Sequence, residues 1–262
     1  PGEDLAGSDD FGDETPAAPA VLALFLNYQR PLYFSAVAAD EITALLAAFP
    51  LRVRDPQMQV QSDTPFDVEA FLANYETCAV DAVKAAFPGE RRPDILSSQK
   101  IISIYLWNRS RLAIRRKHAG DVFVPKITFM HHEDHLKTAI TWSDGVPMVV
   151  PRVDSVILYR KETAARAKLI GRRAPGLELM SFAAFLDMFS DAFHPFDPIP
   201  DGAPASFVLP EAWACAAADW PDLKARVAAL PAGAWQPIGA APKARLFEPV
   251  AAHTVLDAQL FD

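Results

Sequence analysis

Hydrophobic periodicity changes twice along this chain of 262 residues, and the changes limit the folds that it can adopt. Between residues 100 and 159, short segments rich in β-branched and aromatic residues replace the helical spacing seen on either side. The candidate strands are residues 100–107, 111–117, 122–130, 136–142, 146–150 and 153–159. The links between them are too short for the crossovers that parallel strands need. The sequence therefore predicts an α+β fold, with a central antiparallel sheet meander (about residues 100–160) flanked by N-terminal and C-terminal helices.

Several details of the central segment have specific local signals. Residues 109–118 also fit a helix, whose basic side would then form a stripe. Pro125 favours an edge strand or a bulge within residues 122–130. Ser143-Asp144-Gly145 is typical of a hairpin turn, after which residues 146–150 return as the next strand.

The flanking helices are indicated by caps and apolar stripes. Residues 39–49 predict a helix that Asp40 caps and Pro50 ends, and Thr64-Pro65 predicts the start of a second helix. Ser181 predicts the N-cap of a third helix, whose phenylalanine-rich stripe should cover one face of the sheet.

The C-terminal part of the chain is rich in proline. Residues 194–250 contain ten prolines, and they carry only two short helical patterns, at 211–218 and 221–230. Such a segment is expected to wrap a core rather than to build one. We therefore expect one domain over residues 20–262, preceded by an acidic, disordered tail at residues 1–19.

Charge is distributed unevenly along the chain. The formal net charge is −8, but residues 1–90 carry −11, residues 91–173 carry +10 and residues 174–262 carry −7. An acidic total usually argues against an anionic partner. The basic middle removes that objection, because it predicts either a binding surface for an anion or electrostatic docking of the acidic flanks.

Two groups of cations carry this predicted binding surface: Arg109, Arg111, Arg115, Arg116 and Lys117 in the first, and Arg160 and Lys161 at the start of the second. Arginine forks suit phosphate and carboxylate groups. Aromatic residues nearby could stack on bases or sugars, although sheet-core positions are the alternative for them. We expect a non-catalytic recognition or assembly protein that binds a nucleic acid, a phosphorylated ligand or an acidic protein surface.

The alternative function is a metal-dependent hydrolase that uses the loop of residues 131–135. This segment contains three histidines and two acidic residues, which are ligand types for a divalent metal such as zinc or iron. The candidate ligands are His132, Asp134 and His135, which resemble part of the H-x-H-x-D-H signature of the metallo-β-lactamase superfamily. Met130 stands where that signature has its first histidine, and a strand-like segment follows where the superfamily has a helix. The simpler interpretation is a polar hairpin turn.

Other motifs are informative mainly by their absence. The sequence has no Gly-rich phosphate loop and no G-x-S-x-G, H-E-x-x-H or C-x-x-C pattern, so it does not identify an enzyme class. No apolar run approaches the length of about 18 residues that spans a membrane. Two cysteines in helical patterns predict buried thiols, and with no visible signal peptide the expected compartment is the cytoplasm.

Overall fold

The computed structural model describes residues 22–54, 65–88, 94–117, 122–132, 135–159, 177–199, 209–230, 236–237, 248–250 and 255–261. It contains helices together with three sheets, so the predicted α+β class is confirmed. The segment 1–19, predicted to be an acidic tail, lies outside the described residues, and the single domain over 20–262 stays a prediction.

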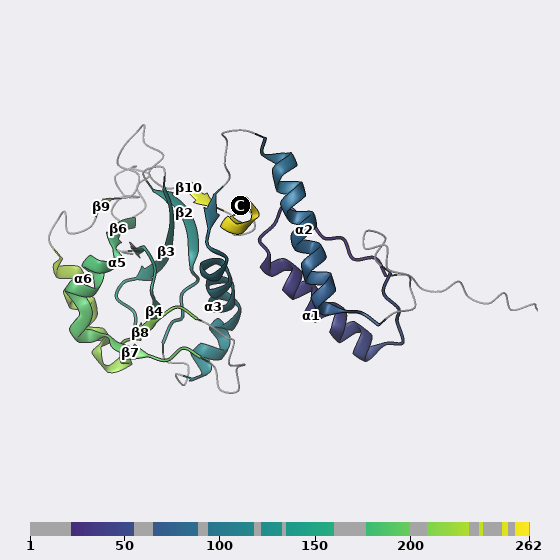
Figure 1. Ribbon diagram of the computed structural model, residues 1–262. Helices are drawn as coiled ribbons and strands as arrows, with labels where there is room; N and C mark the ends of the chain where they lie inside the picture. Colours follow the sequence, from purple (N-terminus) through teal and green to yellow (C-terminus); the bar gives the residue numbers. More distant parts are fainter. Residues whose placement is uncertain are drawn as a thin grey trace, which may run out of the picture.

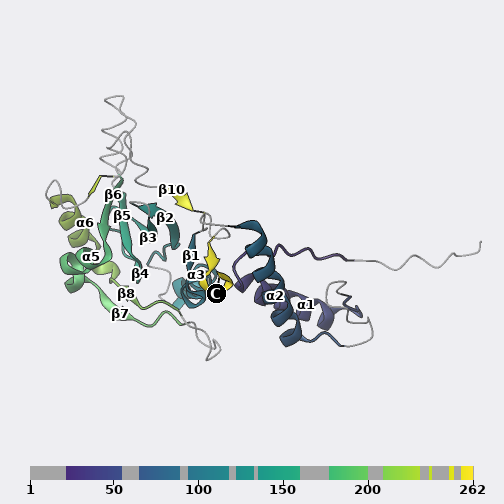
Figure 2. The same cartoon turned by 45° about the horizontal axis from the view of Figure 1, so that its top comes forward.

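Two regions can be followed in Figure 1 and in the turned view of Figure 2. The helical region pairs α1 (Tyr33–Ala48) with α2 (Val68–Ala86), and the C-terminal turn η4 (Ala258–Phe261) packs against α2. The sheet region contains α3 (Ser98–Lys117) and all the longer strands. The short strands β1 (Ile95–Leu96) and β11 (Leu256–Asp257) pair in parallel, so the C-terminus lies where the two regions meet.

Helix α1 begins six residues earlier than its predicted start at residue 39. Asp40 is therefore an exposed position within the helix and not its cap. The cap comes from the other end of the chain, because the Oδ2 atom of Asp257 accepts a hydrogen bond of 2.7 Å from the Leu32 backbone N–H. This long-range partner explains why local sequence placed the start too late.

Helix α2 is the second helix that the sequence predicts. Its buried side chains, Phe71, Tyr75, Ala79 and Val83, recur at intervals of four residues. The cap differs from the prediction, since the Asp67 side chain accepts from the Ala70 N–H and residue 64 lies outside the described residues. A carboxylate at this position also suits the positive end of the helix dipole.

The largest correction concerns residues 98–117, which form one helix rather than two strands. The helical alternative for residues 109–118 is correct over residues 109–117, and the strand predicted at 100–107 is wrong. Ile104, Trp107 and Ile114 are buried at helical spacing, so one face of α3 packs on the core. Trp107 Nε1 also donates to the Pro125 carbonyl at 2.8 Å. Burial of this face outweighs the β propensity of the isoleucines.

The main sheet has six strands in the order β10-β2-β3-β5-β6-β9, which is not a meander. β2 (Thr128–His132) and β3 (His135–Ser143) form the predicted antiparallel hairpin. β5 (Ser155–Tyr159) is then parallel to β3, whereas β6 (Leu177–Ser181) is antiparallel to β5. Short segments at both edges complete the sheet: β9 (Gln236–Pro237) and β10 (Glu248–Val250).

The parallel pair arises because residues 146–150 do not return along β3. Asp144 and Gly145 both have positive φ, and the chain then leaves the main sheet. β4 (Val149–Pro151) instead pairs with β8 (Ala212–Ala214), which also pairs with β7 (His194–Phe196). The turn prediction was therefore correct in its chemistry, but the hairpin inferred from it was wrong.

One face of the main sheet carries the principal core. Helix α5 (Phe182–Phe189) begins at the predicted cap, with Ser181 Oγ accepting from the Ala184 N–H at 3.2 Å. Phe185 and Phe189 make edge-on contacts with the Trp142 ring, at centroid separations of 5.3 and 5.2 Å. α5 and α3 share this core, so the prediction that α5 covers a sheet face is confirmed.

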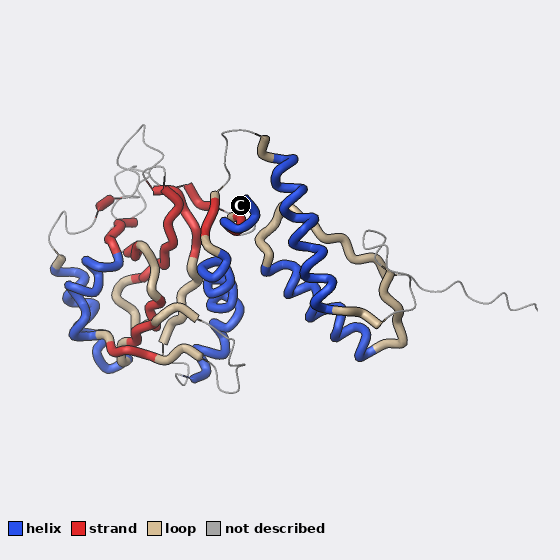
Figure 3. Tube along the Cα trace, in the orientation of Figure 1, coloured by secondary structure: helices blue, strands red, loops and turns tan. Residues whose placement is uncertain are grey.

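The C-terminal part of the sheet region contains short elements, as Figure 3 shows. Residues 211–218, predicted as helical, instead contain β8 and run into the 3₁₀ turn η2 (Ala217–Asp219). Helix α6 (Trp220–Ala229) confirms the second helical pattern, with Pro221 in its first turn. A further 3₁₀ turn, η1 (Ser190–Ala192), links α5 to β7. Within the described residues, every helix is too short or too polar to cross a lipid bilayer.

Candidate anion-binding face on helix α3

Helix α3 carries six basic residues and no acidic residue along its 20 positions. Five of these cations lie in its last nine residues, at positions 109, 111, 115, 116 and 117. Positive side chains in a last turn interact favourably with the negative end of the helix dipole, so part of this pattern serves the helix itself. Which cations are also available to a partner depends on where each side chain lies.

Three of the six cations are fixed by the fold. Arg111 is half-buried and its Nε donates to the Val124 carbonyl at 2.9 Å. Lys117 Nζ donates to the Ile199 carbonyl at 2.8 Å and lies 5.9 Å above the Phe196 ring. These contacts hold α3 to neighbouring segments of the sheet region, and the binding role of Arg111 and Lys117 stays a prediction.

Lys100 is the third fixed cation, and it joins a cluster that sequence reasoning missed. Its Nζ lies 3.3 Å from Asp154 Oδ2, which also accepts from the backbone N–H and the hydroxyl of Thr138, both at 2.7 Å. Burial opposes ionisation of Asp154, but the Thr138 hydrogen bonds and the Lys100 charge outweigh it and lower the pKa of the carboxyl. The cluster fastens the start of α3 to β3 and β5.

The remaining cations, Arg109, Arg115 and Arg116, are exposed. None of them makes an ion pair with a carboxylate in the part of the chain that the structure describes. The side chains of Arg115 and Arg116 also make no hydrogen bond to any described residue. Their guanidinium groups can therefore bind an anion without breaking an existing contact.

An exposed leucine lies between these arginines. Arg109, Leu112 and Arg116 are three and four residues apart, which places them on one side of the helix. The side chain of Leu112 is 69% exposed, although it is a large apolar residue. We call Arg109, Leu112, Arg115 and Arg116 the α3 face; it combines positive charge with an apolar centre.

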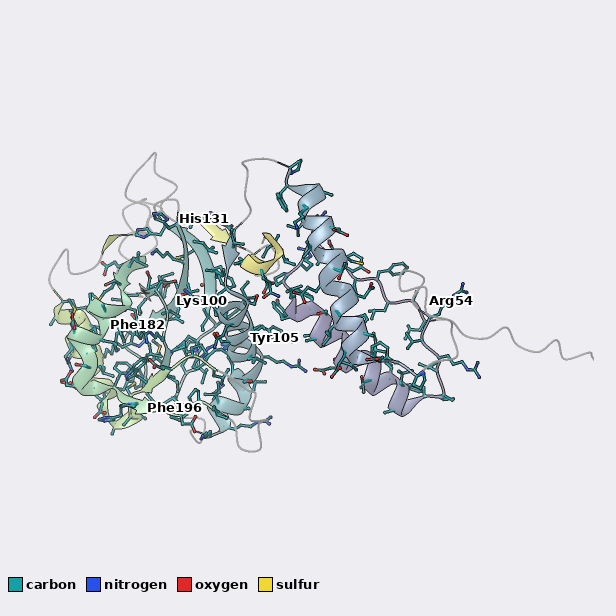
Figure 4. The ribbon with its side chains drawn as sticks, viewed as in Figure 1. Arg54, Lys100, Tyr105, His131, Phe182 and Phe196 are labelled. Atoms are coloured by element: carbon teal, nitrogen blue, oxygen red, sulfur yellow. The ribbon has the colours of Figure 1, made fainter. Side chains whose placement is uncertain are left out.

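The first half of the same helix side is covered by the helical region. Tyr105 stacks on Tyr33 of α1, with ring centroids 4.3 Å apart, and Figure 4 places Tyr105 on the side of α3 that faces α1. Arg109 Nη1 donates to the Tyr105 hydroxyl at 3.0 Å. Burial, the neighbouring Tyr105 and the Asp257 carboxylate raise the pKa of Tyr33 to about 12, so the Tyr33 hydroxyl stays protonated at neutral pH. The α3 face therefore begins where the contact with α1 ends.

Other parts of the predicted binding surface are placed differently. Arg160 and Lys161 lie outside the described residues, so their position relative to α3 stays a prediction. Trp107 and Trp142 are fully buried in the core and cannot stack on a base or sugar. The basic surface is thus a helix face and not the sheet face that the strand prediction implied.

The histidine loop does not assemble a metal site among the described residues. His132 and His135 lie opposite each other in the β2–β3 hairpin, and Asp134 lies outside the described residues. His131 precedes His132 on the same strand and therefore points to the other side of the sheet. Its Nε2 lies 2.6 Å from Asp94 Oδ1, which ties β2 to the segment before β1. Within the described ranges, no group of three or more His, Cys, Asp or Glu side chains could hold a metal ion.

Known proteins offer no further guide to this site. No family model matches the chain, and no curated protein or solved structure is significantly similar to it. The short resemblance of residues 130–135 to the metallo-β-lactamase signature is thus not extended by any match over the chain. The functional argument depends on the α3 face itself.

Proposed function

We propose that this chain is a non-catalytic recognition or assembly protein that binds an anionic partner through the α3 face. The observation that carries the proposal is the exposure of Arg109, Arg115 and Arg116 on a helix without acidic residues. The partner classes that suit such a face are a nucleic acid, a phosphorylated ligand or an acidic protein surface.

Local charge supports this role better than total charge does. The rest of the chain is acidic, so a cluster of cations without carboxylate partners among the described residues produces a local positive potential. Three other cations of the same helix, Lys100, Arg111 and Lys117, are held by contacts within the sheet region. Of the exposed three, Arg109 donates to the Tyr105 hydroxyl, whereas the side chains of Arg115 and Arg116 have no task in the described structure beyond the helix dipole. Exposed guanidinium groups of this kind are free to form hydrogen bonds and ion pairs with an anionic partner.

Binding through exposed arginines is expected to depend steeply on salt. Three phosphate contacts to a single strand give a slope of about −2 in log K against log salt, or roughly a fifteenfold loss of affinity between about 50 and 200 mM salt. The measurement is fluorescence anisotropy with three probes: a single-stranded oligonucleotide, inorganic polyphosphate and polyglutamate. The probe that binds most tightly identifies the partner class.

The test variant replaces Arg109, Arg115 and Arg116 with glutamine. Its matched control replaces Arg54, Lys84 and Lys224 with glutamine, because these cations are exposed, none lies on α3, and the change in net charge is the same. We expect the first variant to lose most of the affinity and most of the salt slope, and the control to keep both. Absence of binding to all three probes at about 50 mM salt, or equal losses in the two variants, would overturn the proposal.

A further inference from the structure

We propose that residues 1–19 of this chain occupy the α3 face when no other anionic partner is bound. The inference rests on the proposed function, since it describes how that same face is regulated. The segment would compete with the partner, so that binding requires its displacement.

Charge complementarity between the two segments is the first argument. Residues 1–19 contain six acidic residues and no basic residue, whereas α3 contains six basic residues and no acidic residue. Because Lys100, Arg111 and Lys117 are held by other contacts, the positive charge left for a partner is concentrated on Arg109, Arg115 and Arg116. No other 19-residue stretch of the chain is as acidic and as free of basic residues. The segment is therefore the strongest anionic ligand that the chain itself supplies.

The exposed leucine gives the second argument, because it favours a peptide over a phosphate backbone. Leu112 is 69% exposed between Arg109 and Arg116, and a phosphate group gains nothing from an apolar side chain. The segment has two large apolar residues, Leu5 and Phe11, and each directly follows an aspartate. Either side chain could cover Leu112 while the adjacent carboxylate meets an arginine.

Chain length is the third argument. Helix α1 touches α3 through the Tyr33–Tyr105 stack, and the segment 22–32 leads from that end of α1 along the helix pair. Ten residues separate positions 32 and 22, and eleven separate positions 22 and 11. At about 3.3–3.6 Å per extended residue, residues 11–22 can extend at least as far as residues 22–32 do. The N-terminal segment can therefore turn back at position 22 and reach the start of α1. Phe11 can thus reach the neighbourhood of α3.

The test places a photo-crosslinking residue, p-benzoylphenylalanine, at position 112 of the full chain. Since Leu112 is exposed, the replacement is expected to fold, which circular dichroism checks. Irradiation followed by peptide mass spectrometry should give an intrachain cross-link between position 112 and residues 1–19. In about 1 M salt, where the Debye length is about 3 Å, the yield should fall several-fold. The matched control carries the same residue at Trp220, which is 42% exposed and begins α6, a helix on the opposite side of the sheet region from α3 (Figure 1).

A second variant separates charge from apolar contact. It replaces the six acidic residues of the segment with their amides (E3Q, D4N, D9N, D10N, D13N and E14Q), and it should lower the cross-link yield from position 112 several-fold. Cross-links from position 112 that map to another segment or to a second copy would overturn the inference, as would equal yields from positions 112 and 220. The proposed function fails by a different result, the absence of binding to every anionic probe, so the two failures can be told apart.

Discussion

In the sheet region the largest side chains, among them Trp142 and Phe185, are withdrawn completely from solvent. In the helical region the positions buried between α1 and α2 include Ala38 and Ala39, while large apolar residues such as Phe25 and Phe49 are on the surface. The sheet region therefore gains most from apolar burial, because buried apolar area scales with side-chain size. The helical region depends more on a few specific contacts, several of them with the C-terminal segment.

The two regions also differ in how completely a carboxylate side chain is hydrogen-bonded. In the sheet region, Asp154 accepts hydrogen bonds from Thr138 and Lys100 on both of its oxygens. In the helical region, Asp257 is fully buried, yet only its Oδ2 has a hydrogen-bond partner among the described residues. A buried polar atom without a partner is costly, so Asp257 stabilises its surroundings less than the fully bonded Asp154 does.

The strongest test of this contrast is removal of a large core side chain. Trp142→Ala should lower the free energy of unfolding by about 3–5 kcal/mol, because it leaves a cavity beside Phe185 and Phe189. Urea unfolding followed by near-ultraviolet circular dichroism measures the loss. The control is Trp220→Ala, at a partly exposed position, for which a change of less than about 1 kcal/mol is expected. Similar losses for the two tryptophans would contradict the assignment of the core.

The C-terminal cap provides a test that is confined to the helical region. Asp257→Leu removes the acceptor for the Leu32 N–H and should cost about 1–3 kcal/mol. Asp257→Asn keeps an acceptor oxygen at this position and should cost less. Hydrogen exchange read by mass spectrometry should show faster exchange in α1 and α2 in the leucine variant, with β3 and β5 unchanged. Equal loss of protection in both regions would mean that they do not unfold separately.

A smaller effect is expected from the polar cluster of the sheet region, and it depends on pH. The pKa of Asp154 is lowered in the folded state, so its contribution to stability is fully present above the unfolded pKa of about 3.9 and is lost as pH falls through the lower folded value. Asp154→Asn should therefore cost about 1–2 kcal/mol at pH 7, where the charged hydrogen bonds are intact. The difference from the parent chain should shrink when unfolding is measured at successively lower pH below 5.

The control for this experiment is Asp187→Asn, which removes an exposed carboxylate on α5. Its effect on stability should be small at every pH. A difference between Asp154→Asn and the parent chain that stays constant down to pH 2 would show that the charge of Asp154 is not what stabilises the cluster.

Local signals predicted those elements whose partners are close in sequence. The β2–β3 hairpin, the Ser181 cap and the presence of helix α2 were all correct, because each depends on contacts within a few residues. The basic run of the α3 face was also visible in the sequence. Its division into fixed and exposed cations was not, since Arg111 and Lys117 are held by carbonyls of Val124 and Ile199, which belong to other elements.

What the sequence determined alone is the mixture of helices and strands, the Ser181 cap of α5, and the uneven distribution of charge. What only the tertiary structure decided is the state of residues 98–117, the parallel pairing of β3 with β5, and the start of α1. The physical reason is the same in each case. An isoleucine-rich segment can bury a face either as a strand or as a helix, and a helix end can take its cap from Asp257, 225 residues away, so the choice depends on which distant groups are present to pack and to accept hydrogen bonds.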